Sequence, residues 1–137
     1  MRLLAVDLGK KRIGIAVGES QPQVISTRPA LTACGVLKLD AESVNKIAKR
    51  EEVDHIVVGL PLEEGEEGRM ASVCRKFGEI LTQLGWSVKY ADETLTSVQA
   101  NANMAQLDMK ASLRKKLRDG EAAALILERF LYGETTA

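Results

Sequence analysis

Apolar residues along the chain form five short runs that predict five β-strands. The runs cover residues 3–6, 13–19, 24–33, 55–59 and 86–91. The first is continuously apolar, as in a strand buried on both faces, and the last alternates apolar and polar positions. The first two lie close enough in sequence to predict a hairpin. Pro29 in the third run favours a sheet edge or a bulge, because proline cannot donate to a strand ladder.

Four other segments carry apolar residues at helical spacing. They cover residues 40–52, residues 69–84, residues 96 to about 107, and a stretch from Leu113 or Leu117 to Tyr132. Asp40 is the predicted N-cap of the first helix, and Thr96 begins a capping box in the third. Residues 62–68 are expected to form a polar loop. The order β-β-β-α-β-α-β-α-α predicts an α/β fold with a mixed five-stranded sheet. Its first three strands are antiparallel, and helices flank both faces.

Length and composition limit the possible classes of protein. The chain has 137 residues, which predicts a single domain with its own core, and its net charge is zero. Nucleic-acid binding, if present, must therefore use a local basic patch. We expect no signal peptide and no membrane span, hence a cytoplasmic protein. Cys34 and Cys74 lack metal-ligand spacing, and we interpret both as reduced core thiols.

Acidic residues follow the first and last predicted strands. Asp7 ends the first strand, and Asp92 and Glu93 follow the last. Open α/β sheets build their sites at the carboxyl ends of strands. Strand alternation would put Asp92 on the face of Tyr90 and Glu93 on the opposite face. Position alone leaves two simpler interpretations open: Asp7 as a turn residue, and the acidic pair as a polar entrance to the next helix.

Asp119 lies on the apolar face of the last predicted helix. At about 100° per residue, it shares that face with Ala122, Ala123, Ile126 and Phe130. The small alanines would let the helix lie close to the sheet, which would bring Asp119 near the strand ends. A carboxylate on a buried face needs partners or a metal, although a first-turn Asp can also interact with the helix dipole. Carboxylates gathered in this way can hold hard cations for phosphodiester cleavage.

Four ordered segments then resemble a known family. They read AVDLGKKRIGIAVGE (5–19), IVVGLPLEEGEEG (56–68), DETLTSVQA (92–100) and RDGEAAALILERFL (118–131). Together they resemble the conserved blocks of the YqgF/RuvX family. The resemblance implies an RNase H-like fold and a nuclease that matures the 5′ end of 16S ribosomal RNA. The same family is often labelled a Holliday junction resolvase.

The resemblance also implies a catalytic centre. Its acidic triad would be Asp7, Glu93 and Asp119, holding Mg²⁺ or Mn²⁺, and these are the positions singled out above. Basic residues near them, together with the family blocks, give the candidate substrate contacts. These are Gly9, Lys10, Lys11, Arg12, Arg69, Thr96, Arg114 and Lys115. Trp86 and Tyr90 are expected in the core rather than as base-stacking platforms.

The chain departs from the family pattern at several positions. Thr94 stands where Arg is usual and cannot contact phosphate bidentately, and Gln99 stands where Glu is usual. Residues 62–68 carry four glutamates, which would repel phosphate unless they bound a metal. These departures bear on substrate contacts more than on the triad.

The leading hypothesis is a two-metal endonuclease acting on structured nucleic acid, with precursor rRNA as the substrate that the family implies. One alternative is a Holliday junction resolvase, which would favour a homodimer over a monomer. Another is a non-catalytic module that binds nucleic acid or ribosomal particles. A sugar kinase or actin-like ATPase is disfavoured, because those proteins clasp ATP between two such domains.

Overall fold

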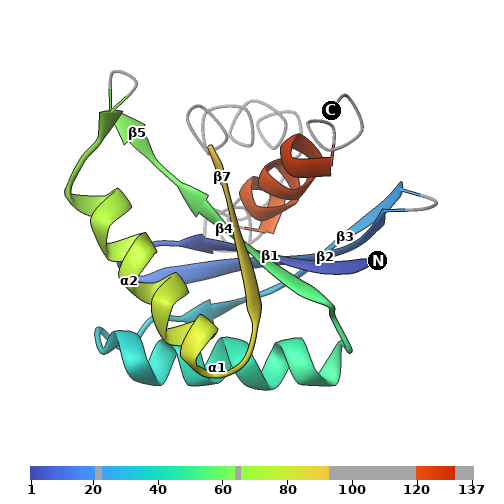
Figure 1. The fold of residues 1–137 in the computed structure, drawn as a ribbon, viewed down its shortest axis with the longest axis horizontal. Helices are drawn as coiled ribbons and strands as arrows, with labels where there is room; N and C mark the ends of the chain where they lie inside the picture. Colours follow the sequence, from blue (N-terminus) through green and yellow to red (C-terminus); the bar gives the residue numbers. More distant parts are fainter. Residues whose placement is uncertain (21–22, 64–65, 93–119, 132–137) are drawn as a thin grey trace, which may run out of the picture.

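A five-stranded mixed sheet forms the centre of the computed structural model, which describes residues 1–20, 23–63, 66–92 and 120–131. Its strands lie in the order β3-β2-β1-β4-β7 (Figure 1). Their bounds are β1 (Arg2–Leu8), β2 (Arg12–Ser20), β3 (Gln23–Thr32), β4 (His55–Leu60) and β7 (Ser87–Asp92). Strands β1, β2 and β3 pair antiparallel, whereas β4 pairs parallel with both β1 and β7. The predicted sheet is therefore confirmed.

Strand β3 is an edge strand with an irregularity where Pro29 lies. Ile13 pairs with Leu31 and Ile15 with Arg28, so two residues of β3 oppose one residue of β2. A bulge of this kind lets proline sit in a strand, because the missing N–H is not required there. The prediction from Pro29 is confirmed.

The helices cover both faces of the sheet, as predicted. Helices α1 (Leu37–Arg50) and α2 (Arg69–Gln83) lie on one face, and a helix over residues 120–131, called here the C-terminal helix, lies on the other (Figure 1). Helix α1 begins three residues before the predicted start, with Val36 as its N-cap. The N-cap role predicted for Asp40 is wrong: Asp40 lies in the first turn and accepts a hydrogen bond from the Cys34 N–H. Among the described residues, no helix is long and apolar enough to cross a membrane.

The segment expected to be a polar loop contains a small hairpin instead. Strands β5 (Leu62–Glu63) and β6 (Glu66–Glu67) pair antiparallel as a separate two-stranded sheet. The prediction missed them because each strand has only two residues and no apolar alternation to detect.

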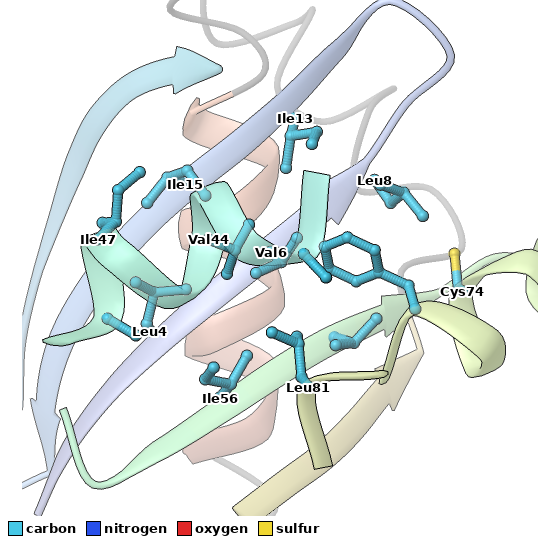
Figure 2. Packing of buried hydrophobic residues seen from close by; sticks show 14 of the residues in the cluster. Leu4, Val6, Leu8, Ile13, Ile15, Val44, Ile47, Ile56, Cys74 and Leu81 are labelled. Carbon is cyan, nitrogen blue, oxygen red and sulfur yellow. The ribbon is translucent and has the colours of Figure 1, made fainter. Parts of the chain in front are cut away.

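The core has two parts, one on each side of the sheet. The larger lies between the sheet and the helices α1 and α2, and includes Leu4, Val6 and Leu8 of β1 (Figure 2). The smaller lies between the sheet and the C-terminal helix, and includes Leu3 and Ala5. Successive residues of β1 therefore alternate between two buried layers, which explains its continuously apolar sequence.

Four side chains test the core predictions individually. Trp86 and Tyr90 pack against the larger cluster, as expected, and the Trp86 indole N–H donates to Asn45. Cys74 is buried, but Cys34 is exposed, so the prediction that both thiols lie in the core is wrong for Cys34. The position of Cys34 between β3 and α1, outside either element, accounts for its exposure.

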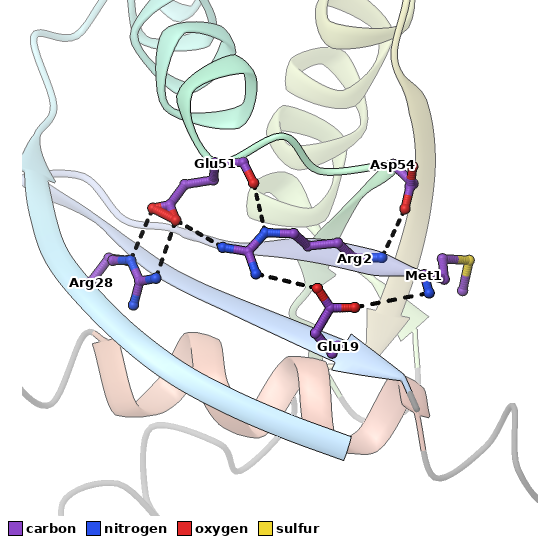
Figure 3. A network of polar contacts seen from close by, with 6 residues as sticks. All are labelled: Met1, Arg2, Glu19, Arg28, Glu51 and Asp54. Carbon is purple, nitrogen blue, oxygen red and sulfur yellow. Dashed lines mark hydrogen bonds and ion pairs between the residues drawn. The ribbon is translucent and has the colours of Figure 1, made fainter. Parts of the chain in front are cut away.

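A polar network ties the end of α1 to strands β1, β2 and β3 (Figure 3). Glu51 is the C-cap of α1. Its two carboxylate oxygens each accept a hydrogen bond from the Arg28 guanidinium at 3.1 Å, and one of them also accepts a hydrogen bond from Arg2 Nη2 at 3.0 Å. Arg2 also contacts Glu19 at 3.3 Å. Hydrogen bonds from Arg28 and then from Arg2 hold the pKa of the Glu51 carboxyl below its ordinary value, while burial acts in the opposite direction. One carboxylate thus connects α1, β1 and β3.

Replacing Glu51 by Gln is expected to lower the free energy of unfolding by about 1–2 kcal/mol, because several partly screened charge pairs are lost together. The folded-state pKa of Glu51 is depressed, so its stabilisation exists above the unfolded value of about 4.3. It is lost as the pH falls through the folded pKa. Thermal unfolding of wild type and variant should therefore differ at pH 7 and converge in acid. Exposed Glu128, changed to Gln, serves as the control, and an equal difference at both pH values would contradict this account.

Candidate functional site

Asp7 lies near the carboxyl end of the central strand β1, one residue before Leu8. Its side chain is partly buried, and its backbone is opposite Gly14 of β2. Leu3 and Ala5 pack beneath the C-terminal helix. Because alternate strand residues share a face, Asp7 belongs to that face as well. Asp7 is therefore presented at the strand ends on the side of the C-terminal helix.

The C-terminal helix packs closely on this face. Its buried residues are Ala122, Ala123, Ile126, Leu127 and Leu131. Three of these were predicted on the inner face, and Phe130 packs at its margin. A side chain at Gly120 would lie 3.3 Å from Thr27 Cβ, and one at Gly18 would lie 2.8 Å from Leu127 Cδ2. Glycine and alanine thus allow the close approach that the sequence predicted, and the helix begins above β3.

The carboxyl end of β7 reaches the same edge of the sheet. Asp92 pairs in register with Leu60 of β4, and Ala91 packs on the cluster beneath the C-terminal helix. Tyr90 packs on the other face, against α2 and its neighbours. Ala91 and Asp7 therefore point to the same side of the sheet, from strands separated only by β4.

Five predicted site residues lie outside the described part of the chain: Glu93, Thr96, Arg114, Lys115 and Asp119. Their roles stay predictions. Within the described ranges, no group of three or more His, Cys, Asp or Glu side chains could hold a metal ion. His55 pairs with Leu3 at the opposite end of β1 from Asp7, which separates the single histidine from the candidate site.

The turn after Asp7 carries four of the predicted substrate contacts. The Gly9 N–H donates to the Arg12 carbonyl at 3.0 Å, and a Cβ at Gly9 would lie only 2.6 Å from that oxygen. Glycine is thus needed for this tight connection. The Ala33 N–H donates to the Lys11 carbonyl at 2.9 Å, which anchors the turn to the end of β3. Lys10 and Lys11 are exposed at its tip.

The structure separates the predicted basic contacts between the two faces of the sheet. In β2, Ile13 packs on the α1/α2 side and Ala16 on the other, so alternation places Arg12 on the face of Asp7. Lys10 and Arg69 instead line a cavity on the α1/α2 side. The basic residues therefore do not all converge on Asp7.

That cavity, called here the α1/α2 pocket, has a volume of about 590 Å³. It lies where β1 ends and where α1 and α2 begin. Its lining residues are Leu8, Gly9, Lys10, Ala33, Gly35, Leu37, Asp40, Arg69, Met70 and Val73. Sequence reasoning did not find this pocket, because its walls come from three stretches that are distant in sequence and no motif marks most of their residues.

The acidic hairpin is partly neutralised. Glu67 receives two hydrogen bonds from the Arg75 guanidinium, at 2.5 and 2.6 Å, and Arg75 also lies over the Tyr90 ring, 5.0 Å from its centroid. The hydrogen bonds from Arg75 hold the pKa of Glu67 below its usual range. At least this one of the four glutamates has a cation partner, so its charge repels phosphate less than the sequence suggested.

Comparisons with known proteins agree with the geometry. Residues 1–133 match the family model described as RuvX, Holliday junction resolvase. A relative from Myxococcus xanthus is 36% identical over 96% of this chain and 87% of its own length. A relative from Endomicrobium trichonymphae is 40% identical over 95% of this chain and 94% of its own length. Both carry the name of a candidate pre-16S rRNA nuclease.

Solved structures show the same fold at low sequence identity. Thermus thermophilus RuvC in complex with a Holliday junction substrate is 13% identical, with a TM-score of 0.56 over 98% of this chain and 96% of that one. The fowlpox virus Holliday junction resolvase is 16% identical, with a TM-score of 0.57 over 97% of this chain and 99% of the resolvase chain. Because the family model spans nearly the whole chain and close relatives match along most of their own length, the chain belongs to the RuvX family and has an RNase H-like fold.

Proposed function

We propose that this protein is a metal-dependent endonuclease, acting as a single domain in the cytoplasm, that processes the 5′ end of precursor 16S rRNA. Its membership of the RuvX family and the names of its relatives support nuclease activity. The substrate, the metal and the site residues are parts of the proposal.

One observation carries the proposed catalytic centre: Asp7, Ala91 and the C-terminal helix share one face of the sheet. If β7 keeps its alternation for one more residue, Glu93 falls on the face of Ala91, beside Asp7. Asp119 directly precedes the first described residue of the C-terminal helix. The triad would then gather at the strand ends beneath that helix.

Carboxylate oxygens are the ligands that Mg²⁺ and Mn²⁺ prefer, and a half-buried Asp7 at a strand end is suited to supply them. Asp7, Glu93 and Asp119 would hold such ions, and the bound ions would supply activation of water and stabilisation of the leaving oxygen. Arg12, on the face of Asp7, would orient the scissile phosphate.

Precursor rRNA is favoured over branched DNA because the relatives with extensive identity are named for it. Four-way DNA junctions are the second candidate, supported by the description of the family. Junction resolution cuts two strands symmetrically and would require a homodimer, whereas rRNA processing is possible for a monomer acting on ribosomal particles. A non-catalytic binding role is the remaining alternative.

Replacing Asp7 by Asn should abolish Mn²⁺-dependent cleavage, because a neutral amide binds a hard cation much more weakly than a carboxylate does. The assay compares a precursor rRNA fragment with a four-way DNA junction and measures product formation for wild type and variant. We expect wild type to cut the rRNA fragment and the variant to lose at least 10²-fold in rate. The fold should be retained, which thermal unfolding will show.

Asp54→Asn provides a matched control at the opposite end of the sheet. Asp54 accepts the Arg2 N–H at 2.8 Å, and an amide oxygen can do the same. This variant should cleave like wild type. Full activity of Asp7→Asn, or no cleavage of either substrate by wild type, would contradict the proposed mechanism.

Binding to RNA should weaken with salt, because phosphate contacts release counterions. Lys11→Gln removes one exposed charge from the turn after Asp7. It should make the slope of log K against log salt shallower by about 0.7–0.9. Lys46→Gln, an exposed position on α1, should leave the slope unchanged. Equal effects of the two variants in a fluorescence anisotropy titration would exclude the turn as a phosphate contact.

A further inference from the structure

The α1/α2 pocket lies beside the proposed catalytic face but is separate from it. Asp7 and Leu8 are consecutive on β1, and Leu8 lines the pocket. Because consecutive strand residues point to opposite faces, the pocket opens on the side of the sheet away from the Asp7 carboxylate. Its volume of about 590 Å³ is in the range of small-molecule sites.

The pocket combines apolar walls with a cationic mouth. Leu8, Met70 and Val73 supply apolar surface, while Lys10 and Arg69 are exposed at the rim. The helices α1 and α2 both begin here, and their N-caps, Val36 and Gly68, have no polar side chain that could cap them. Asp40 lies in the first turn of α1 and offsets its dipole, whereas the first turn of α2 has no acidic residue, so the positive end of the α2 dipole adds to the two cations. The rim suits phosphate, and the walls suit a flat apolar group.

Asp40 makes the floor of the pocket polar. It is only 5% exposed, and its Oδ1 accepts the Cys34 N–H at 3.0 Å. Its Oδ2 makes no hydrogen bond to the part of the chain that the structure describes, and it is not among the fully buried unpartnered atoms there, so a ligand in the pocket can reach it. A ligand N–H group can donate to this oxygen, whereas a bare phosphate would be repelled by its charge. The floor therefore favours a ligand that brings an N–H group.

We propose that the α1/α2 pocket binds one unpaired base of the nucleic-acid strand, with the exocyclic amino group of an adenine donating to Asp40 Oδ2. This rests on the proposed function and adds a subsite to it. The apolar walls would enclose the base, and Lys10 and Arg69 would contact the phosphates on either side of it. A strand that crosses the end of β1 would then place its base in the pocket and a neighbouring phosphate near Asp7. The pocket would select where the strand is cut.

The test uses RNA duplexes with a fluorescent end label and one bulged position. The bulge holds adenosine, purine riboside (which lacks the amino group) or an abasic residue, and a fourth duplex has no bulge. Affinity is measured by anisotropy in EDTA, so that no strand is cut. For wild type we expect the adenosine bulge to bind about tenfold tighter than the abasic or unbulged duplex, with purine riboside weaker than adenosine.

Asp40→Asn is the diagnostic variant. Its amide oxygen can still accept the Cys34 N–H, which leaves an NH₂ group facing the pocket in place of Oδ2. Adenosine should lose about tenfold in affinity, while purine riboside, whose ring nitrogen accepts a hydrogen bond, should be unchanged or bind tighter. A merely structural role for Asp40 would weaken all four duplexes equally, and that result would overturn the proposal.

A second variant tests the pocket independently, in case Asp40→Asn fails to fold. Val73→Phe narrows the pocket from α2 and should abolish the preference for a bulge without changing affinity for the unbulged duplex. Leu84→Phe, at the exposed far end of α2, should keep the preference. Retention of the bulge preference in Val73→Phe would overturn the proposal.

Two further arms separate the possible failures. Adenosine monophosphate is added as a competitor: if it binds in an Asp40-dependent way while the bulged duplexes show no preference, the pocket takes a free nucleotide and the strand proposal is overturned. Cleavage of rRNA by wild type with Mn²⁺ tests the proposed function independently. If wild type cleaves rRNA but shows no preference for a bulged duplex, the proposed nuclease function is supported and the proposed base-binding site is overturned.

Discussion

Burial of β1 on both faces is the constraint on which this structure depends. The strand has neighbours on both sides in the sheet and a hydrophobic layer above and below. Its side chains must therefore alternate between two cores, and a shift of one residue would exchange them. The same alternation continues to the end of the strand, where it directs Asp7 to one face and Leu8 to the other. The position of the acidic residue is thus set by the packing of the apolar residues before it.

The charge distribution follows from this architecture. The net charge is zero, yet the carboxyl edge of the sheet carries Lys10, Lys11 and Arg12 on a turn that glycine makes possible. Arg2 at the start of β1 and Arg28 of β3 are instead paired with Glu51, where they stabilise the junction of α1 and the sheet. The cations that stabilise this junction are therefore different residues from Lys10 and Lys11, which are exposed on the turn. A neutral chain can in this way present a local basic surface.

Much of the fold could be predicted from periodicity. The run of apolar residues in β1, the alternation in β7 and the bulge at Pro29 each follow from rules that involve only near neighbours in sequence. The inner face of the C-terminal helix was also predicted, since Ala122, Ala123 and Ile126 are buried. The errors concern local detail. Asp40 resembled an N-cap, but α1 begins earlier and buries it, and Cys34 resembled a core thiol, although it lies in an exposed connection.

The sequence by itself determined the family, the order of the elements and the acidic positions, because each depends on residue type and spacing. Only the tertiary structure decided on which face of the sheet each of these residues lies. Arg12 and Arg69 were indistinguishable as basic candidates, yet strand alternation places Arg12 with Asp7, and helix packing places Arg69 at the α1/α2 pocket. The pocket itself required the structure, because it exists only where β1, the β3–α1 connection and the starts of two helices meet. Residues that are distant in sequence carry no local pattern that would reveal such a meeting.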